Sequence, residues 1–449
     1  MTDEAAARRV ADRVIEHVRQ RVPSAEAEVT VHTGIDSLTR FANGFIHQNV
    51  VEEVSHVALR LAVDGSVAGT SLDGRPDDHA LGRLVDDVLD AARVRPPDPD
   101  WPGLAGPADA PDAGHWDDST AAAQPDERAS RVADFVGAAG ELETAGACQS
   151  SALQTAFANS AGQRLAGRGT AAAIDGIART GTSDGSARVA SVRLADIDGR
   201  HVGEEAARRA REAANPGDLE PGRYEVVLEP QCVADILLFL ELYGFNGRAI
   251  EEGRSFVRLG ESQFDEAITL REDAGHPLQV GIGFDAEGTP RRPLELIRGG
   301  VTAAAIHTRR TAARAGTTST GHAVEGGESY GALPAAPVLE SGDRPTDELV
   351  RSVGRGLLVT DFWYTRILDP RTQVVTGLTR NGVWLVEDGR IVRPVSNLRF
   401  TQSYVEALAP GAVLGVSSEQ VLVDGGFGAS FVVPALHLAA WNFTGGARG

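Results

Sequence analysis

An acidic residue, Glu241, lies within a long, largely apolar run. The run begins at Cys232, and residues 240–245 within it read LELYGF. A carboxyl group among apolar side chains can serve as a general acid or base, because burial raises its pKa. No histidine or other ligand stands beside Glu241 in the sequence. The pattern alone therefore favours a carboxylate on the water-facing side of a mostly buried helix.

The histidine and cysteine spacings predict no local metal site. None of the eleven histidines lies three, four or five residues from another. A zinc-binding helix needs two imidazoles on one face, so this arrangement is absent. The two cysteines, Cys148 and Cys232, are far apart and form no CxxC pair. The chain also has no lysine, which excludes a lysine Schiff base and a Walker A motif.

Two glycine-rich stretches could hold a ligand through bare backbone N–H groups. The stretch TTSTGHAVEGG (317–327) interleaves polar and small residues, and its Thr320, Gly321 and His322 are predicted substrate-binding residues. The stretch DGGFGAS (424–430) is the second. The G-x-S-x-G match at 327–331 lacks the strand before it and the helix after it. It therefore predicts a loop and not a nucleophile elbow.

The first half of the chain predicts an α+β domain over residues 1–217. A helix over 3–21 leads into an antiparallel meander, and a second helix covers 77–93. Asn43-Gly44 and Asp64-Gly65 predict two tight hairpin turns in that meander. Residues 95–126 are rich in Pro, Asp and Ala and indicate a surface crossing or linker.

The second half predicts a larger, strand-rich domain over residues 218–449. The sequence NPGD at 215–218 marks the boundary. A buried helix is expected over 230–243, and further hairpins at Asn381-Gly382 and Asp388-Gly389. The fold class is thus α+β with two domains.

The charge and hydropathy of the chain restrict its partners. A net charge of −20 disfavours nucleic-acid binding through a general basic face. No apolar stretch is long enough for a membrane span, and the charged N-terminal residues lack the apolar core of a signal peptide. These features predict a cytoplasmic protein that binds neither membrane nor nucleic acid.

Several stretches, in order along the chain, resemble the TldD/TldE (PmbA) family of metallopeptidase-related proteins. They include SLTRFANGFIHQN, GRYEVVLEP with the apolar helix after it, GRSFVRLG and TRNGVWLVEDGRIVRPVSNLRFTQSY. The catalytic branch of that family carries HExxxH on this helix, and a cysteine near the C-terminus completes its zinc site. The resemblance places Leu240 and Phe245 at the two histidine positions and Glu241 at the glutamate. The serines of GVSSEQ fall near the place of the cysteine.

The resemblance therefore implies a metal-free, non-catalytic TldE-like subunit. Such a subunit pairs with a TldD-like HExxxH partner that holds the zinc, and the pair cleaves peptides, including those matured in natural-product pathways. Arg40 and Asn43 in the meander are further substrate-binding candidates, although Asn43 also suits a turn. A homo-oligomer is an alternative assembly.

Two other functions remain open on the sequence. The first is a metal-free biosynthetic enzyme that uses Glu241, Tyr243 and His322 as acids and bases in the old peptidase cleft. The second is a regulatory protein that binds another protein.

Overall fold

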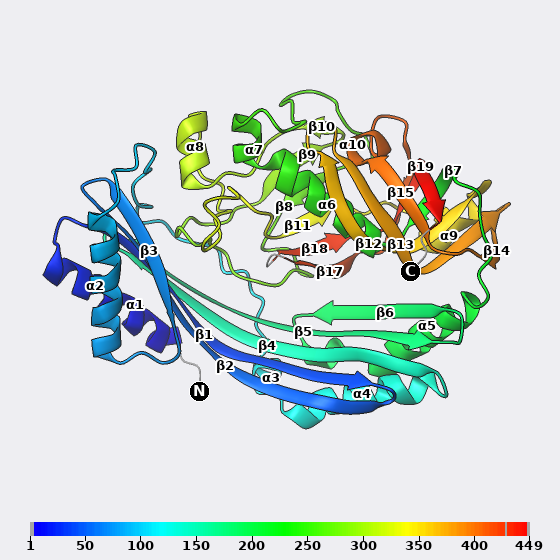
Figure 1. Cartoon of the computed structure of the whole chain (residues 1–449), viewed down its shortest axis with the longest axis horizontal. Helices are drawn as coiled ribbons and strands as arrows, with labels where there is room; N and C mark the ends of the chain where they lie inside the picture. The colour runs from blue at the N-terminus through cyan, green and yellow to red at the C-terminus, as the bar shows by residue number, and fades with distance from the viewer. Residues whose placement is uncertain (1–3, 427–428, 447–449) are drawn as a thin grey trace.

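A computed structural model describes residues 4–426 and 429–446 of the chain, so Phe427 and Gly428 in the second glycine-rich stretch lie outside it. The N-terminal part alternates helices with long strands (Figure 1). Its elements are α1 (Glu4–Arg21), β1 (Glu26–Ala42), β2 (Phe45–Val63), β3 (Ser66–Asp73), α2 (Asp78–Arg93), α3 (Asp118–Ala121), α4 (Pro125–Ala139), β4 (Glu143–Asn159), β5 (Arg164–Arg179), β6 (Asp184–Ser191), a 3-10 turn (Leu194–Asp196) and α5 (Gly199–Glu212).

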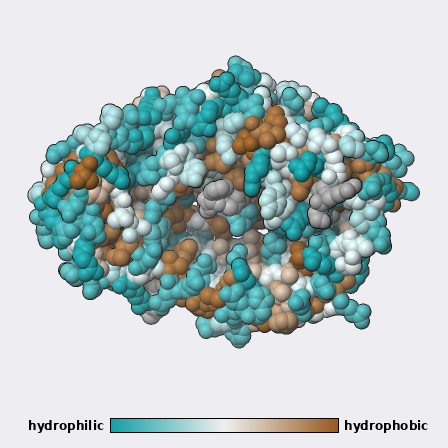
Figure 2. Space-filling view, viewed as in Figure 1, coloured by the Kyte–Doolittle hydropathy of each residue, from teal (hydrophilic) through white to brown (hydrophobic). Residues whose placement is uncertain are grey.

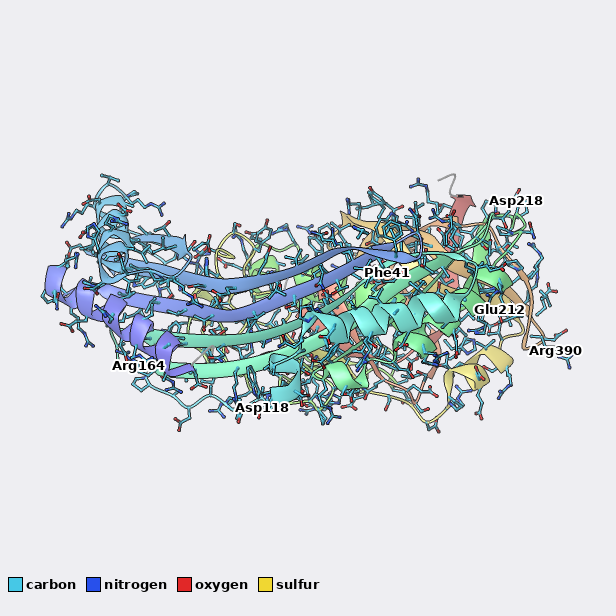
Figure 3. The ribbon with its side chains drawn as sticks, turned by 90° about the horizontal axis from the view of Figure 1, so that it is seen from below. Phe41, Asp118, Arg164, Glu212, Asp218 and Arg390 are labelled. Carbon is cyan, nitrogen blue, oxygen red and sulfur yellow. The ribbon has the colours of Figure 1, made fainter. Side chains whose placement is uncertain are left out.

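One antiparallel sheet organises this part, in the order β3-β2-β1-β4-β5-β6. The predicted turns are confirmed: Asn43 and Gly44 have φ of 52° and 78°, and Asp64 and Gly65 have φ of 50° and 81°. Positive φ at both central residues matches the right-handed twist of the flanking strands. Seen from below, the long strands extend from the end marked by Arg164 to the end marked by Phe41 (Figure 3).

Two pairs of helices cover opposite ends of this sheet. The helices α1 and α2 bury aliphatic side chains against the beginning of β1 and the ends of β2 and β4. The helices α4 and α5 pack against the other end, where Phe135 contacts Phe41 with ring centroids 5.2 Å apart. The sheet is thus anchored at both ends, while its middle faces the C-terminal part (Figure 1).

The C-terminal part is dominated by short strands around one buried helix. Its elements are β7 (Gly222–Leu228), α6 (Pro230–Leu240), a π-helical turn (Glu241–Phe245), α7 (Gly247–Glu251), β8 (Leu270–Glu272), β9 (Leu294–Arg298), β10 (Val301–Thr302), α8 (Arg309–Ala315), β11 (Pro337–Leu339), α9 (Thr346–Arg351), β12 (Arg355–Asp369), β13 (Val374–Glu387), β14 (Arg390–Pro394), β15 (Leu398–Ser403), α10 (Tyr404–Ala407), β16 (Val413–Val416), β17 (Val421–Gly426), β18 (Ala429–Val433) and β19 (Leu436–Gly446).

These strands form two sheets. One has the order β10-β9-β8-β11-β18-β17. The other has the order β12-β7-β19-β15-β13-β14, and an additional β12–β13 pairing closes five of its strands into a ring. The helix α6 contacts β12 and β7 of the ring and β17 and β18 of the other sheet. The predicted α+β fold with a strand-rich C-terminal domain is therefore confirmed.

Three features differ from the sequence-based expectations. The hairpin predicted at Asn381-Gly382 is wrong, because β13 runs through both residues and the β12–β13 register shifts there as a bulge. The helix predicted over 230–243 ends at Leu240 and continues as the π-helical turn. The crossing over 95–126 contacts both halves of the chain. In particular, His115 Nε2 donates to Ala274 O at 2.7 Å, and the His115 carbonyl accepts from Thr170 N.

The position of the boundary at 217–218 stays a prediction. The last helix on the N-terminal sheet ends at Glu212, and the first strand of the closed ring begins at Gly222. Within the part of the chain that the structure describes, no helix is long and apolar enough to cross a membrane.

Candidate functional site

The helix α6 and its π-helical turn lie at the centre of the C-terminal core. The helix begins at Pro230, whose missing N–H is tolerated in the first turn. Leu240 and Phe245 are both fully buried. The Phe245 ring packs against Phe256 and Phe264, with centroids 5.6 and 6.4 Å away. The two positions that the resemblance aligns with zinc ligands are therefore filled by hydrophobic core.

Glu241 is fully buried as well, so its expected place on a water-facing side is wrong. The π-helical turn directs its side chain into the protein, and neither carboxyl oxygen faces a hydrogen-bond donor. Burial, together with the nearby Glu272 carboxylate, raises the pKa of Glu241 well above its usual range. This environment favours the protonated, neutral form of Glu241, which donates a hydrogen bond to Glu272.

Glu272, at the end of β8, is the charged member of this pair. Its two oxygens accept hydrogen bonds from Ala335 N at 3.0 Å and Ala336 N at 2.7 Å. His322 Nε2 lies 3.3 Å from Glu272 Oε2, at an angle outside good hydrogen-bond geometry. Burial alone would raise the pKa of Glu272, but the His322 imidazole and the hydrogen bonds hold it below its usual range.

The glycine-rich loop over 317–327 supplies His322, the third side chain of this cluster with Glu241 and Glu272. His322 is 2% exposed, and its Nδ1 lies 2.8 Å from Thr320 Oγ1. The Thr320 hydroxyl oxygen also accepts from His307 N at 2.7 Å. Gly321 has φ of 80°, and a Cβ there would come within 3.0 Å of the Pro290 carbonyl oxygen, so glycine is required. Of the predicted residues, His322 lies against Glu272, Thr320 holds the His322 ring, and Gly321 lets the loop turn between them. We call Glu241, Glu272 and His322 the buried carboxyl group.

The donor chemistry of this group does not suit the zinc site of the catalytic branch. Leucine and phenylalanine have no lone pair for a metal, and Glu272 already accepts two backbone N–H groups. Ser417 of the GVSSEQ block bonds to the backbone of Ala435 and Glu419. Across residues 4–426 and 429–446, no three His, Cys, Asp or Glu side chains are placed to hold a metal ion.

A cleft of about 730 Å³ lies beside the buried carboxyl group, between the two halves of the chain. The surface is hollowed where the upper and lower parts of the molecule meet (Figure 2). One wall comes from β1, β2 and β3, and the other comes from Thr308, the arginines of α8 and the loop over 323–329. This loop directly follows His322, so one segment forms both the back of the buried group and the wall of the cleft.

Arg60 holds the two walls together. It pairs with Glu28 across the β1–β2 ladder and with Glu287 of the C-terminal part, where Nη2 and Oε1 are 3.0 Å apart. Glu287 also accepts from Arg309 N at 2.8 Å. Burial and the Glu287 charge raise the pKa of Glu28 to about 7, although Arg60 opposes the shift. We call Glu28, Arg60 and Glu287 the interdomain group.

The remaining predicted residues lie elsewhere. Arg40 is twelve residues beyond Glu28 on β1, which is roughly 40 Å along a strand at about 3.3 Å per residue. Asn43 occupies the turn after β1. The Tyr243 ring packs against Phe239 at 5.7 Å, on the outside of the buried carboxyl group. The sequence analysis did not predict Glu272 or Arg60 as site residues. Each meets its partners only through strand pairing or a loop far away in the sequence, and no sequence motif marks such a residue.

Comparisons with known proteins agree with this architecture. A family model described as the PmbA/TldA metallopeptidase C-terminal domain matches residues 221–445. The chain is 26% identical over 223 residues to a metalloprotease of Methanothermobacter thermautotrophicus, an alignment covering 47% of this chain and 46% of the relative. It is 27% identical over 204 residues to a metalloprotease PmbA homolog of Haemophilus influenzae, covering 44% and 42%. The chain thus aligns with less than half the length of these relatives.

The likeness in fold is more extensive. The crystal structure of TldE from Thermococcus kodakarensis matches with a TM-score of 0.88, over 97% of this chain and 100% of that one. At 20% identity this match describes the fold alone. Because the family model spans the whole closed ring and the buried helix, the chain belongs to the PmbA/TldD family of metallopeptidase-related proteins.

Proposed function

We propose that this chain is a metal-free, TldE-like subunit of a heterodimeric zinc metallopeptidase that acts on peptides in the cytoplasm. The observation that carries the proposal is the replacement of both aligned ligand positions by the fully buried Leu240 and Phe245. Zinc needs nitrogen, sulfur or oxygen donors, and neither side chain supplies one. In this proposal a TldD-like partner with HExxxH holds the zinc and activates the water.

The role of this subunit is to shape the substrate chamber. The cleft between the two halves is lined by both signs of charge and by several hydroxyl groups, including Thr30, Thr70 and Ser329. Such a lining suits the alternating N–H and C=O groups of an extended peptide, which need donors and acceptors in equal number. In this proposal the predicted substrate-binding residues Thr320, Gly321 and His322 do not touch the peptide. They support the adjoining loop over 323–329, which lines the cleft. Arg40 and Asn43 have no place in the cleft.

Metal analysis tests the proposal. The chain is purified without a His-tag, alone and after co-expression with a TldD-like subunit, and its zinc is measured by elemental mass spectrometry alongside peptide hydrolysis. We expect well under one zinc per chain and no hydrolysis for the chain alone, and one zinc per heterodimer with hydrolysis for the complex. A stoichiometric zinc in the isolated chain, or full hydrolysis by it, would overturn the proposal.

A second candidate is a metal-free acid–base enzyme, and one observation favours it. Glu241 and His322, far apart in sequence, both meet Glu272. However, the three side chains are at most 3% exposed, so a substrate would have to open the core to reach them. An isolated chain that turns over a substrate, and loses that activity in Glu241→Gln without losing its fold, would establish this alternative.

A further inference from the structure

A row of polar side chains crosses four strands of the N-terminal sheet. Thr155 of β4, His32 of β1, His56 of β2 and Asp73 of β3 lie opposite one another in register. Residues opposite one another on neighbouring strands share a face of the sheet, so their side chains meet. His32 Nδ1 lies 2.9 Å from Thr155 Oγ1, and the rings of His32 and His56 stack with centroids 6.1 Å apart. His56 Nδ1 lies 2.6 Å from Asp73 Oδ1.

The loop over 323–329, which lines the cleft, meets this row through one carboxylate. Glu325 Oε1 lies 2.7 Å from His56 Nε2, and Glu325 Oε2 lies 3.9 Å from His32 Nε2. In the part of the chain that the structure describes, the hydrogen bonds and ion pairs between residues 324–327 and the N-terminal sheet all involve Glu325. One side chain of the C-terminal part is thus held by two histidines of the sheet.

Residues 324–327 form a tight turn that is fixed at both of its ends. Before the turn, Ala323 is bonded through both its N–H and its carbonyl. After the turn, Arg248 Nη1 donates to the Glu328 carbonyl at 2.9 Å, and Arg60 Nη1 lies 3.5 Å from the Glu328 carboxylate. Arginine keeps its charge at any accessible pH, so the two arginine contacts persist over the range in which histidine titrates. The histidine contact is therefore the part of the attachment to the sheet that loss of a histidine proton weakens.

The contacts of His56 require two N–H donors on its ring. Both ring nitrogens lie within 2.7 Å of a carboxylate oxygen, from Asp73 on one side and from Glu325 on the other. Neutral imidazole has a single N–H, so only the imidazolium satisfies both contacts. Burial lowers the pKa of His56, but the hydrogen bonds and charges of the two carboxylates outweigh burial and raise this pKa above 6.5. Burial lowers the pKa of His32, and the His56 charge adds to the shift, although Glu325 opposes it. The titratable groups that face His56 are thus His32 of β1, Asp73 of β3 and Glu325 of the loop.

We propose that the proton on His56 controls one wall of the cleft. The imidazolium holds Glu325, and with it the turn over 324–327, against the N-terminal sheet. When His56 loses this proton, one carboxylate contact loses its donor, and the attraction between opposite charges disappears from the other. The turn then leaves the sheet more often. Because the turn lines the cleft, loss of the proton widens the cleft on this side. This inference does not depend on the proposed peptidase role.

Cleavage by a glutamate-specific endoprotease tests the proposal, because Glu325 must leave His56 before the protease can bind its side chain. The full chain is digested at a series of values from about pH 6 to about pH 9, which cover the range in which histidine titrates. The cut after Glu325 is followed by mass spectrometry. A synthetic peptide with the sequence of residues 319–332 is digested in parallel and corrects for the pH dependence of the protease. We expect a corrected rate roughly tenfold higher at about pH 9 than at about pH 6, because a charge-assisted hydrogen bond is about twice as strong as a neutral one.

Two variants and a matched control separate His56 from general effects of pH. His56→Gln removes the titrating group, so its corrected rate should be high and should not change with pH. Asp73→Asn removes one of the two carboxylates from the ring, so the rise in rate should begin at a lower pH than in the wild type. The Asp73 side chain is 87% exposed, and the fold therefore tolerates this change. The control is His79→Gln, at an exposed histidine of α2, which should keep the wild-type rates.

Three results would overturn the proposal. The first is a wild-type chain whose corrected rate does not change with pH, or that is not cut after Glu325 at any pH. The second is a pH effect that persists in His56→Gln, because another group would then control the turn. The third comes from NMR of the histidine ring protons: the signal that His56→Gln lacks should titrate with the same midpoint as the cleavage rate, and a different midpoint would contradict the role of His56.

Discussion

Two groups of buried carboxyl side chains in this molecule are neutralised in opposite ways. In the buried carboxyl group, burial favours the protonated form of Glu241, which donates a hydrogen bond to Glu272, and the Glu272 charge is met by backbone N–H groups and His322. In the interdomain group, the Arg60 guanidinium lies between Glu28 and Glu287. One segment links the two groups, since the loop after His322 lines the cleft that Arg60 also lines.

The difference shows two ways in which one fold accommodates buried carboxyl groups. A buried carboxylate is costly without a compensating charge, and the least demanding compensation is a proton. Glu241, which our proposal aligns with the catalytic glutamate, is closed inside the core, where burial favours its neutral form. Charge remains at the interface, where Arg60 pairs with carboxyl groups from both halves of the chain at the cleft. We therefore expect changes at the interface to affect stability most and the change at Glu241 to affect it least.

The largest expected effect comes from Arg60→Met. This substitution keeps much of the side-chain volume but leaves Glu28 and Glu287 without their cation, which costs about 3–5 kcal/mol of unfolding free energy. The measurement is urea unfolding followed by tryptophan fluorescence, because Arg60 lies 5.2 Å from the centre of the Trp101 ring. The matched control is Arg13→Met, which removes an exposed ion pair with Asp78 and should cost under about 1 kcal/mol. Equal losses in the two variants would contradict the assigned role of Arg60.

Glu272→Gln should have the next largest effect, at about 2–3 kcal/mol. Glutamine has one acceptor oxygen and an NH₂ group, so either Ala335 N or Ala336 N loses its partner inside the core. Chemical denaturation measures the loss. Glu261→Gln is a suitable control, because Glu261 forms an exposed pair with Arg258. A loss no greater than that of the control would show that Glu272 does not hold the loop around Ala335.

The pH dependence of stability tests Glu28 separately from the other buried carboxyl groups. Its pKa is raised from 4.5 to about 7, so the folded state binds this proton more tightly than the unfolded state does. The stabilisation that proton binding at Glu28 gives the folded state is therefore fully present below about pH 4.5, and it is lost as the pH rises through about 7. Between pH 5 and pH 8, the wild type should lose roughly 2 kcal/mol more unfolding free energy than Glu28→Gln. Parallel pH profiles for the two proteins would contradict the raised pKa.

Much of the fold could be predicted from local sequence patterns. Turn residues such as Asn43-Gly44 have a direct conformational reason, and the α6 segment is largely apolar, as suits a helix between two sheets. The same turn signal failed at Asn381-Gly382. A positive φ also suits a bulge within a strand, and only the β12–β13 pairing distinguishes a bulge from a turn.

The candidate site was predictable only in part. The resemblance identified Leu240, Glu241 and Phe245, and the glycine-rich pattern identified His322. The orientation of Glu241 could not be predicted, because it depends on the π-helical turn that rotates residues 241–245 relative to α6. Glu272 and Glu287 come near their partners only when β8 and the adjacent loop are packed, and no spacing in the sequence records that.

The smallest expected effect is also the sharpest test of the comparison. Glu241→Gln preserves the shape of the side chain and a donor for the Glu272 carboxylate, so it should change the unfolding free energy by under about 1 kcal/mol. Glu241→Leu removes that donor and should cost more, about 1–3 kcal/mol. Both values come from the same denaturation experiment at pH 7. If Glu241→Gln proved as damaging as Arg60→Met, Glu241 would have to be ionised, and the two groups would be neutralised alike. A small effect would instead identify a proton as the occupant of the place beside Glu272.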